Sequence, residues 1–500
     1  MSRKEQYKHG ASGTSNIRER CRGQEVGIRK QRREKLLNSK RVRLEEVAEE
    51  LEEVEYTVEQ VKQTSKALQV HSNDRLSLLK TLKKMFAQGS GLVEAFLSVD
   101  NSLRCLVGLL SGTDPALQLE AAWCVTNLSA SIHEHCLLAL KHAAPYLITY
   151  LSGQNAVLQD QCCWALGNIA GDGPECRDTL LTQGALQPMV NLLESPVTSV
   201  VQSAAFALSN LARGPGANTK LLIDAAIAPK LLHLLSSCHD NLDLLSEVSW
   251  VLTYLTASGE HEVLLESLGI IPNLVSNLVN VATNHPNNGP TITPLVRCLG
   301  NICSGPEEYV TMAIQDGRLL PVISHLLKSE HRHVQKETLW ALNNMTESEG
   351  VCEQVVKLGV LANIVHHLHS TYDIKREAVV CLCNLAYRGP AYCQDILHLG
   401  AFPEVVAMLK SHDPDTICLA LGFAEMILRQ TKNGSRIFEE NDGVARLEAL
   451  EYHGNQTVQQ QANELLETYF YQDTEQQDSG EQDDPTDYPT WRLNTSEEKR

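Results

Sequence analysis

A ten-residue motif, with Trp at its third position in four copies and Asn at its seventh in six, recurs seven times along the chain. Its seventh position is held in turn by Asn127, Asn168, Asn210, Tyr254, Asn301, Asn344 and Asn384. Successive copies are separated by 41, 42, 44, 47, 43 and 40 residues, a regularity that chance does not explain. A chain with this period is built from units that stack on one another rather than around one central core.

A second signal recurs between these copies, in which a Gly or Ala turn precedes a Pro and an apolar stretch. It begins at Gly184, Ala225, Gly269, Gly317 and Gly400. Because Gly ends helices and Pro opens them, each unit is predicted to contain a short helix, a second helix and a long helix. That content at this period is typical of armadillo and HEAT repeats. We therefore expect an all-α, armadillo-repeat right-handed α-solenoid with a concave groove over residues 76–470.

Length and composition narrow the class of protein. At 500 residues the chain is too long for one compact core, which stops growing near ~250–300 residues. No apolar stretch reaches the ~18 residues of a membrane-spanning helix, and the N-terminus lacks the apolar segment of a secretory signal. We expect a protein of the cytosol or nucleus with no membrane span.

The 15 Cys contain no C-x-x-C pair and are expected to stay reduced. His133, His135 and Cys136 resemble metal ligands, but the sequence offers them no partner cluster. We therefore predict no metal site and no cofactor.

Charge is distributed unevenly along the chain. Residues 18–43 carry eleven Lys or Arg against three Glu, a net charge of +8, so the total of −18 leaves −26 for the rest. A basic arm on an acidic body favours docking on the chain itself or on an acidic partner. Direct nucleic-acid binding is disfavoured, because the body would repel phosphate. Residues 1–17 and 471–500 are predicted to be disordered, and 44–75 to form an acidic helical linker.

Trp at position i and Asn at i+4 share one helix face, so stacked units would align them as two rows, which we call the Trp/Asn ladder. Asn carries a hydrogen-bond donor and an acceptor, and can bind the main chain of an extended peptide without reading its sequence. The Trp rings form slots for Lys or Arg side chains, each contact being worth ~0.5–2 kcal/mol. The alternative is that Trp and Asn only pack the repeats together.

Four acidic residues stand close to the ladder in the sequence. Asp172 follows Asn168 by four residues. The other three precede a ladder position by three residues: Glu247, Glu337 and Glu377. Any one of them could be an ordinary solvated charge, but together with the acidic body they predict a basic peptide as the ligand.

At these residues the sequence resembles the importin alpha family, the adaptors that recognise nuclear localisation signals. The resemblance is carried by CCWALGNIAGDGPECRD, TPLVRCLGNI and VQKETLWALNNMT, and it extends from about residue 18 to residue 470. It implies a major signal-binding site formed by Trp123, Asn127, Trp164, Asn168, Phe206 and Asn210, with Asp172 pairing with a Lys of the signal. It implies a minor site formed by Arg297, Asn301, Glu337, Trp340, Asn344, Glu377 and Asn384. Between the two sites lie Glu247, Trp250 and Tyr254.

The stretch RKQRREKLLNSKRVR resembles the family's importin-beta-binding segment. The resemblance implies that this arm binds an importin-beta-type carrier and otherwise occupies the signal groove. The implied carrier-binding residues are Arg29, Lys30, Arg32, Arg33, Lys35, Lys40, Arg41 and Arg43. Shuttling between cytoplasm and nucleus, and a nuclear exporter that recycles the adaptor, are implied as well.

Departures from the family pattern leave a second hypothesis open. Phe206 and Val380 stand where Trp is expected, Ser131 replaces a Gly, and the segment RGPAYCQDIL resembles a divergent importin-alpha-like protein more than ordinary importin alphas. We therefore weigh a nuclear import adaptor against an armadillo scaffold that has lost transport. An enzyme is disfavoured, because the sequence has no P-loop, no G-x-S-x-G motif and no acid/base pair on a loop.

Overall fold

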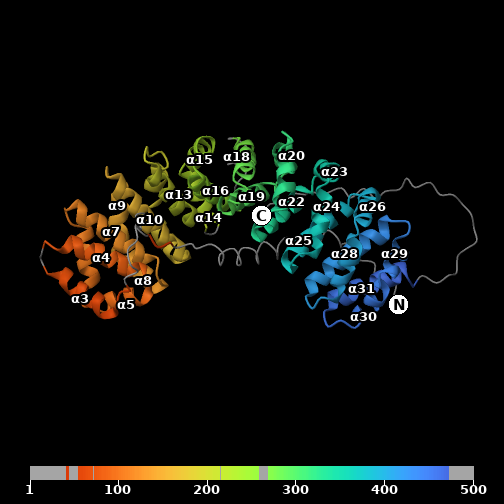
Figure 1. Ribbon diagram of the computed structural model, residues 1–500, viewed down its shortest axis with the longest axis horizontal. Coiled ribbons are helices and arrows are strands. Elements are labelled where there is room, and N and C mark those ends of the chain that lie inside the picture. The colour runs from red at the N-terminus through yellow and green to blue at the C-terminus, as the bar shows by residue number, and fades with distance from the viewer. Residues whose placement is uncertain (1–40, 44–54, 71–72, 214–215, 258–268, 472–500) are drawn as a thin grey trace, which may run out of the picture. The chain divides into compact units, whose positions relative to one another are not determined.

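The computed structural model describes residues 41–43, 55–70, 73–213, 216–257 and 269–471 (Figure 1). Within these residues the regular elements are α-helices and two short 3-10 helices, without a strand, which confirms the predicted all-α class. The chain divides into two compact units, Met1–Val405 and Val406–Arg500. Both segments predicted to be disordered lie outside the described residues, except for Tyr471.

The first unit is a succession of helical repeats, most of which show three helices within the described residues. It begins with α3 (Val58–Gln69), α4 (Arg75–Ala87), α5 (Ser90–Leu97), α6 (Ser102–Leu110), α7 (Pro115–Ser129), α8 (His133–His142), α9 (Ala144–Leu151), α10 (Ala156–Asp172), α11 (Pro174–Thr182), α12 (Leu186–Leu192) and α13 (Thr198–Ala212). It continues with α14 (Gly216–Asp224), α15 (Ile227–Ser237), α16 (Leu242–Thr256), α18 (Ile270–Asn284), α19 (Gly289–Ile302), α20 (Glu307–Ile314), α21 (Leu319–Leu326), α22 (Arg332–Met345), α23 (Glu349–Lys357), α24 (Val360–His366), η1 (His367–His369), α25 (Tyr372–Ala386) and α26 (Pro390–His398). α27 (Ala401–Ala407) crosses the boundary between the units.

The third helix of each repeat packs against its counterparts in the neighbouring repeats. These helices can be followed in Figure 1 as α4, α7, α10, α13, α16, α19, α22 and α25. Their apolar side chains are buried between repeats, as with Leu166 and Ile169 of α10 and Leu208 of α13, which are 0% exposed. Burial of one such side chain stabilises the fold by about 1.5–3 kcal/mol. The predicted armadillo-type stacking is therefore confirmed.

Four of the third helices begin at an Asp or Asn whose side chain caps the first turn. The Asp114 carboxylate accepts hydrogen bonds from two N–H groups of α7 at 2.9 and 3.4 Å. Asn155, Asn241 and Asn288 cap α10, α16 and α19 in the same way. Each cap supplies a partner for N–H groups that the helix itself leaves unpaired, and stabilises it by about 1 kcal/mol.

The predicted Gly turns lie directly before or near the second helix of their repeats. Gly184, Gly269, Gly317 and Gly400 have φ of 83°, 62°, 73° and 76°, and Ala226 takes the same left-handed conformation at 56°. Glycine favours this region because it has no Cβ to clash with the carbonyl. The following Pro occupies the third helical position, not the first as predicted. It is tolerated there because N–H groups of the first turn have no partner within the helix.

The folded body begins earlier than the predicted boundary at residue 76. α3 packs against α4, α5 and α6, and its Val61 and Leu68 are 0% exposed. These two residues are seven apart and therefore lie on one helix face. Residues 58–69 thus belong to the first repeat rather than to a linker, while residues 44–54 lie outside the described part of the chain.

The second unit is helical as well. It contains η2 (Met408–Lys410), α28 (Pro414–Gln430), α29 (Gly434–Glu440), α30 (Gly443–Leu450) and α31 (Gln456–Tyr469). Its core includes Leu447 and Leu466, both 0% exposed. In neither unit does a described helix combine the length and the apolar character that crossing a membrane requires.

Candidate functional site

Three consecutive third helices, α7, α10 and α13, each carry an aromatic ring and an Asn four residues later. We call these six residues the first ladder segment: Trp123, Asn127, Trp164, Asn168, Phe206 and Asn210. Positions i and i+4 share one helix face, and the three helices pack against one another. The rings and the amides therefore follow one another from repeat to repeat, as the spacing predicts.

Each ladder Asn donates a hydrogen bond to a main-chain carbonyl of the preceding third helix. Asn168 Nδ2 lies 3.1 Å from the Thr126 oxygen, and Asn210 Nδ2 lies 2.9 Å from the Gly167 oxygen. The same bond is made by Asn127, Asn301, Asn344 and Asn384. A bond of this kind contributes about 1 kcal/mol. Packing between repeats, the alternative interpretation of the ladder, thus accounts for part of what each Asn does.

Arg41 of the basic arm lies on the first ladder segment with its main chain. Its N–H donates to Asn168 Oδ1 at 2.8 Å, and its carbonyl accepts from Asn168 Nδ2 and from the Trp164 indole at 2.9 Å each. Asn168 therefore pairs with the backbone of Arg41 as a residue of a neighbouring β-strand would. Since Nδ2 also donates to Thr126, one side chain both joins two repeats and binds an extended chain.

Arg43 repeats this arrangement one repeat earlier. Its N–H donates to Asn127 Oδ1 at 2.9 Å, and its carbonyl accepts from the Trp123 indole at 3.1 Å and from Asn127 Nδ2 at 3.3 Å. Val42 between them is 42% exposed. Alternate residues of an extended chain thus meet successive repeats. Residues 41–43 therefore run antiparallel to the order of the repeats on the first ladder segment.

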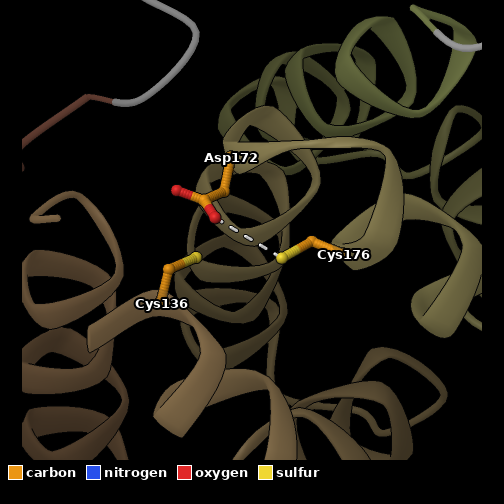
Figure 2. Close-up of side chains that lie close together, drawn as sticks. All are labelled: Cys136, Asp172 and Cys176. Carbon is orange, nitrogen blue, oxygen red and sulfur yellow. Dashed lines mark hydrogen bonds between the residues drawn. The ribbon is translucent and has the colours of Figure 1, made fainter. Parts of the chain in front are cut away.

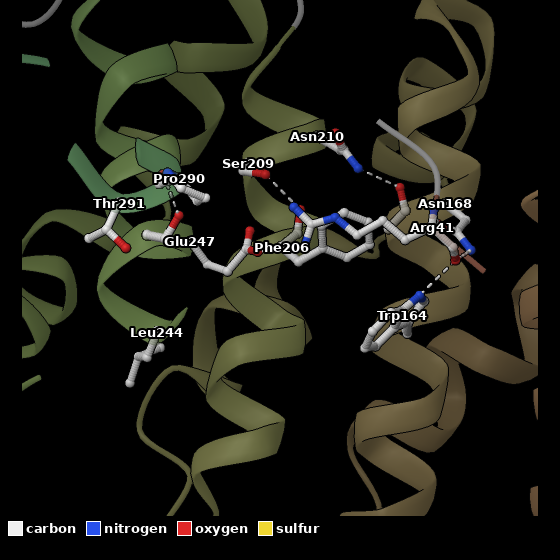
Figure 3. A network of polar contacts seen from close by, with 12 residues as sticks. Arg41, Trp164, Asn168, Phe206, Ser209, Asn210, Leu244, Glu247, Pro290 and Thr291 are labelled. Atoms are coloured by element: carbon white, nitrogen blue, oxygen red, sulfur yellow. Dashed lines mark hydrogen bonds and ion pairs between the residues drawn. The ribbon is translucent and has the colours of Figure 1, made fainter. Parts of the chain in front are cut away.

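The Arg41 side chain lies between an aromatic ring and a carboxylate (Figure 3). Its Cζ is 4.3 Å from the centre of the Phe206 ring, and its Nη1 is 2.5 Å from Glu247 Oε1. Burial raises the pKa of Glu247, and the Arg41 cation partly opposes that rise. Burial alone would favour the neutral form of the Glu247 carboxyl. The guanidinium of Arg41 stabilises the charged form instead.

The Arg43 side chain lies near two rings and a second carboxylate. Its Cζ is 4.7 Å from the centre of the Trp164 ring and 5.6 Å from that of Trp123, and its Nη2 is 2.7 Å from Asp160 Oδ2. The Asp160 side chain is only 8% exposed. Asp160 was not among the predicted site residues, although it precedes Trp164 by four residues and therefore shares its helix face. Testing this spacing beside the spacing of three would have found it.

Two rings of the ladder, those of Phe206 and Trp340, lie directly against a glycine of the preceding third helix. A Cβ on Gly167 would be 2.7 Å from two atoms of the Phe206 ring, and a Cβ on Gly300 would be 2.4 Å from the Trp340 ring. Real Cβ atoms do not approach other atoms so closely, so the position requires glycine. In both places the glycine directly precedes the ladder Asn.

A lysine of the first repeat also contacts the ladder. Lys83 Nζ lies 3.7 Å from the centre of the Trp123 ring and 2.8 Å from Glu120 Oε2, and its side chain is 3% exposed. Neither Lys83 nor Glu120 was predicted from the sequence, because they lie 37 positions apart in it. Trp123 is therefore in contact with a cation of the folded body as well as with Arg43.

Asp172, predicted to pair with a Lys of a bound signal, has its carboxylate against two residues of the repeats themselves. His133 Nδ1 lies 2.5 Å from Asp172 Oδ2, and Cys176 Sγ lies 3.5 Å from it. The Asp172 side chain is 4% exposed, and its hydrogen bond and charge raise the pKa of His133. Pairing with a peptide Lys stays a prediction, and it requires this carboxylate to exchange partners.

The second ladder segment consists of the residues implied as the minor site: Arg297, Asn301, Glu337, Trp340, Asn344, Glu377 and Asn384. Arg297 stands where a ring is found in other repeats, and its guanidinium donates two hydrogen bonds to Glu337 at 2.8 Å each. Its Cζ lies 5.4 Å from the centre of the Trp250 ring. The chain therefore supplies its own cation to this carboxylate.

Other predicted residues nearby also have partners within the fold. Asn343 Nδ2 donates to Glu377 at 2.9 Å, and Glu377 is 3% exposed. Tyr254 stacks on Trp250 with ring centres 6.0 Å apart, and Arg213 Cζ lies 5.2 Å from the Tyr254 ring. The structure thus brings these residues into contact with the repeats' own side chains. Six of the implied carrier-binding residues lie outside the described chain: Arg29, Lys30, Arg32, Arg33, Lys35 and Lys40.

Comparison with known proteins finds relatives over most of the chain. A family model described as TMCO6 matches residues 61–471. Importin subunit alpha-9 of Arabidopsis thaliana is 30% identical over 502 residues, which cover 91% of this chain and 95% of that protein. Importin subunit alpha-2 of Oryza sativa subsp. japonica is 30% identical over 498 residues, which cover 91% and 93%.

Among solved structures, the crystal structure of an engineered protein matches this chain with a TM-score of 0.72. The match covers 81% of this chain and 98% of that one at 24% identity, and it therefore concerns the fold alone. The sequence matches confirm the resemblance inferred from the repeat motifs. They are importin subunits rather than enzymes, in agreement with the prediction that the chain has no catalytic activity.

Proposed function

From the premise that the chain belongs to the TMCO6 family and to the wider group of importin alpha proteins, we propose that it is a nuclear import adaptor. Its first ladder segment binds the basic nuclear localisation signals of cargo proteins. Its N-terminal arm couples it to an importin-beta-type carrier, and the adaptor shuttles between cytoplasm and nucleus with the help of an exporter.

The observation that carries this proposal is the way in which Arg41 and Arg43 lie on the ladder. Their main chains are bound by Asn168 and Asn127, which read no sequence, whereas their side chains meet rings and buried carboxylates. This arrangement selects an extended peptide with cations at alternate positions. A signal rich in Lys and Arg meets that requirement in the same register as the arm.

The arm and a cargo signal compete for the same atoms of Trp164 and Asn168. A signal therefore binds only when the arm has left, and a carrier that holds the arm releases the ladder for cargo. The remaining basic residues of residues 18–40 extend the surface available to the carrier. Carrier binding and cargo binding are thus positively coupled.

Fluorescence anisotropy with a labelled Lys/Arg-rich peptide tests the proposal on the full chain. Arg41→Ala/Arg43→Ala should bind the peptide at least about tenfold more tightly than the wild type, because a loss of ~1.4 kcal/mol from the arm suffices for that factor. Val42→Ala serves as the matched control and should behave as the wild type. Adding Trp164→Ala to the arm variant should abolish the gain. An arm variant that binds no peptide would refute the proposal.

A second candidate function, an armadillo scaffold without transport, is favoured by the state of the second ladder segment. The Glu337 carboxylate is already paired with Arg297, and Val380 stands where an aromatic ring is expected. A chain in which only the first ladder segment binds peptides would bind fewer classes of signal than a chain in which both segments do. Nuclear accumulation of a signal-bearing fluorescent cargo in permeabilised cells separates the two functions. Adding the chain together with a carrier should increase this accumulation if the chain is an adaptor, and should not if it is a scaffold.

A further inference from the structure

We propose that Cys136, Cys176 and Asp172 form a binding site for a thiophilic divalent cation of the zinc class. Their two sulfur atoms and a carboxylate oxygen lie within 4.8 Å of one another (Figure 2). Among the residues that the structure describes, this is the one set of three His, Cys, Asp or Glu side chains whose ligand atoms meet so closely. The geometry of this cluster is independent of transport, although Asp172 is also the carboxylate predicted to pair with a Lys of a bound signal.

Three helices of two adjacent repeats bring these ligands together. Cys136 lies in the first turn of α8, Asp172 is the last residue of α10, and Cys176 lies in the first turn of α11. Gly173 alone separates α10 from α11, and this short connection keeps Asp172 and Cys176 close together. Because the ligands come from rigid helices, the site is largely organised before a cation arrives.

The distances suit a tetrahedral cation. Zinc binds thiolate at about 2.3 Å and carboxylate at about 2.0–2.2 Å, so that neighbouring ligand atoms lie roughly 3.5–3.8 Å apart. Cys176 Sγ is already 3.5 Å from Asp172 Oδ2, and the remaining ligand pairs lie within 4.8 Å. Small rotations of the side chains therefore complete the site, and a water molecule takes the fourth position.

The surroundings fit two thiolates and a cation. Both thiols are 0% exposed, whereas the Asp172 side chain is 4% exposed and its partner His133 is 51% exposed. His133 is the most exposed of these four residues, so a cation approaches the buried ligands from its side. Two thiolates and one carboxylate carry three negative charges, so a divalent cation removes most of the charge that burial makes costly.

His133 completes the arrangement as a positioning residue. Its Nδ1 bonds to Asp172 at 2.5 Å and orients the carboxylate. Metal-bound carboxylates are commonly held by such a second hydrogen bond, whose loss weakens metal binding by about 10–100-fold. The sequence alone did not reveal the partners of His133 and Cys136, because Asp172 lies at the far end of the same repeat and Cys176 in the next one.

Another buried cysteine of the chain provides a control. Cys303 is 2% exposed and lies outside the cluster. Cys303→Ser is therefore the matched control for substitution of a buried cysteine outside the cluster.

The test is a titration of the full, reduced, tag-free chain with Co²⁺ as a spectroscopic stand-in, followed by displacement with Zn²⁺. One Co²⁺ per chain should bind and give a thiolate-to-cobalt charge-transfer absorption, which Zn²⁺ removes. Cys136→Ser and Cys176→Ser should each lower this absorption, and Cys303→Ser should retain it. Far-ultraviolet circular dichroism checks that each variant is folded.

His133→Ala, an exposed position with little risk for folding, keeps both thiolates. It should retain the absorption at saturation but require about 10–100-fold more Co²⁺. Absence of the charge-transfer band in the wild type would overturn the proposal. So would a band that Cys136→Ser and Cys176→Ser leave unchanged, or one that Cys303→Ser removes to the same extent.

Discussion

Arg41 and Asn168 form a reciprocal pair of hydrogen bonds, from the arginine N–H to Oδ1 at 2.8 Å and from Nδ2 to the arginine carbonyl at 2.9 Å. A single side chain thereby satisfies both main-chain groups of one residue of the arm. Asn168 also bonds to Thr126 of the preceding repeat, so the same amide serves the fold and the bound chain. This double use distinguishes the first ladder segment from simple packing.

Asn168→Ala should therefore affect both stability and peptide binding. Loss of the bond to Thr126 should lower the midpoint of thermal unfolding. Loss of the bonds to the peptide main chain should lower the affinity for a Lys/Arg-rich peptide by roughly 10-fold or more, measured in the Arg41→Ala/Arg43→Ala background. Asn344→Ala is the matched control, since Asn344 makes the same bond between repeats, to Gly300. It should lower the midpoint similarly while leaving the peptide affinity of the first segment unchanged. Equal losses of affinity in both variants would contradict this account.

Peptide binding should weaken as the pH falls, because of Glu247. Burial raises the pKa of Glu247, and a bound guanidinium lowers it again, so the cation binds the deprotonated carboxyl. The affinity for the peptide should be highest at pH values above the pKa that Glu247 has without bound peptide. It should fall as the pH drops through that pKa. Anisotropy titrations of the Arg41→Ala/Arg43→Ala chain at about pH 7.5 and about pH 5 measure this loss. Glu247→Gln should bind the peptide more weakly, and its peptide affinity should depend little on pH. If the affinity of Glu247→Gln still falls with pH as in the parent chain, another titratable group is responsible.

Arg297→Ala should destabilise the chain strongly, because it leaves Glu337 without its bidentate partner. The two side chains are only 6% and 13% exposed, and removal of one member of a buried ion pair costs about 3–5 kcal/mol. Arg297→Ala/Glu337→Ala should regain part of the lost thermal stability. A double-mutant cycle by calorimetry measures the coupling, and additive effects of the two substitutions would argue against a pair that is important for the fold.

Gly300→Ala should destabilise the second ladder segment, since the new Cβ would meet the Trp340 ring at 2.4 Å. Displacing a packed ring costs about 1–3 kcal/mol, which a lower thermal midpoint would report. Gly108→Ala is the control, because this helical glycine has no atom within 4 Å of the new Cβ. It should be neutral or stabilising by up to about 1 kcal/mol, as alanine favours helix. A midpoint unchanged by Gly300→Ala would mean that the ring can move freely.

The repeat period predicted the fold because every unit repeats the same apolar faces, turns and caps. Asn127, Asn168 and their successors were found for the same reason, since a fixed spacing along a helix fixes the face. The start of the domain was missed because the acidic residues around α3 hide the spacing of Val61 and Leu68. A helix packed through a few apolar residues gives a weak periodic signal.

The partners of the charged residues could not be predicted from the spacing of residues in the sequence. Arg297 and Glu337 stand 40 residues apart in adjacent repeats, and His133 and Asp172 stand 39 apart in two helices of one repeat, so each pairing depends on how the helices pack. The register of the arm was equally hidden, because its many Lys and Arg offer several alternative pairs for the same two slots. Only the fold shows that Arg41 and Arg43 occupy them.

Amide hydrogen exchange of Arg41 and Arg43, read at single-residue resolution by mass spectrometry, tests the central claim most directly. In the full chain alone, both N–H groups should exchange slowly, because Asn168 and Asn127 hold them. Saturation with a Lys/Arg-rich peptide should remove this protection, since the peptide takes over the same ladder positions. Unchanged protection at saturating, bound peptide would contradict the claim that arm and cargo share the first ladder segment, and so would unprotected amides in the free chain.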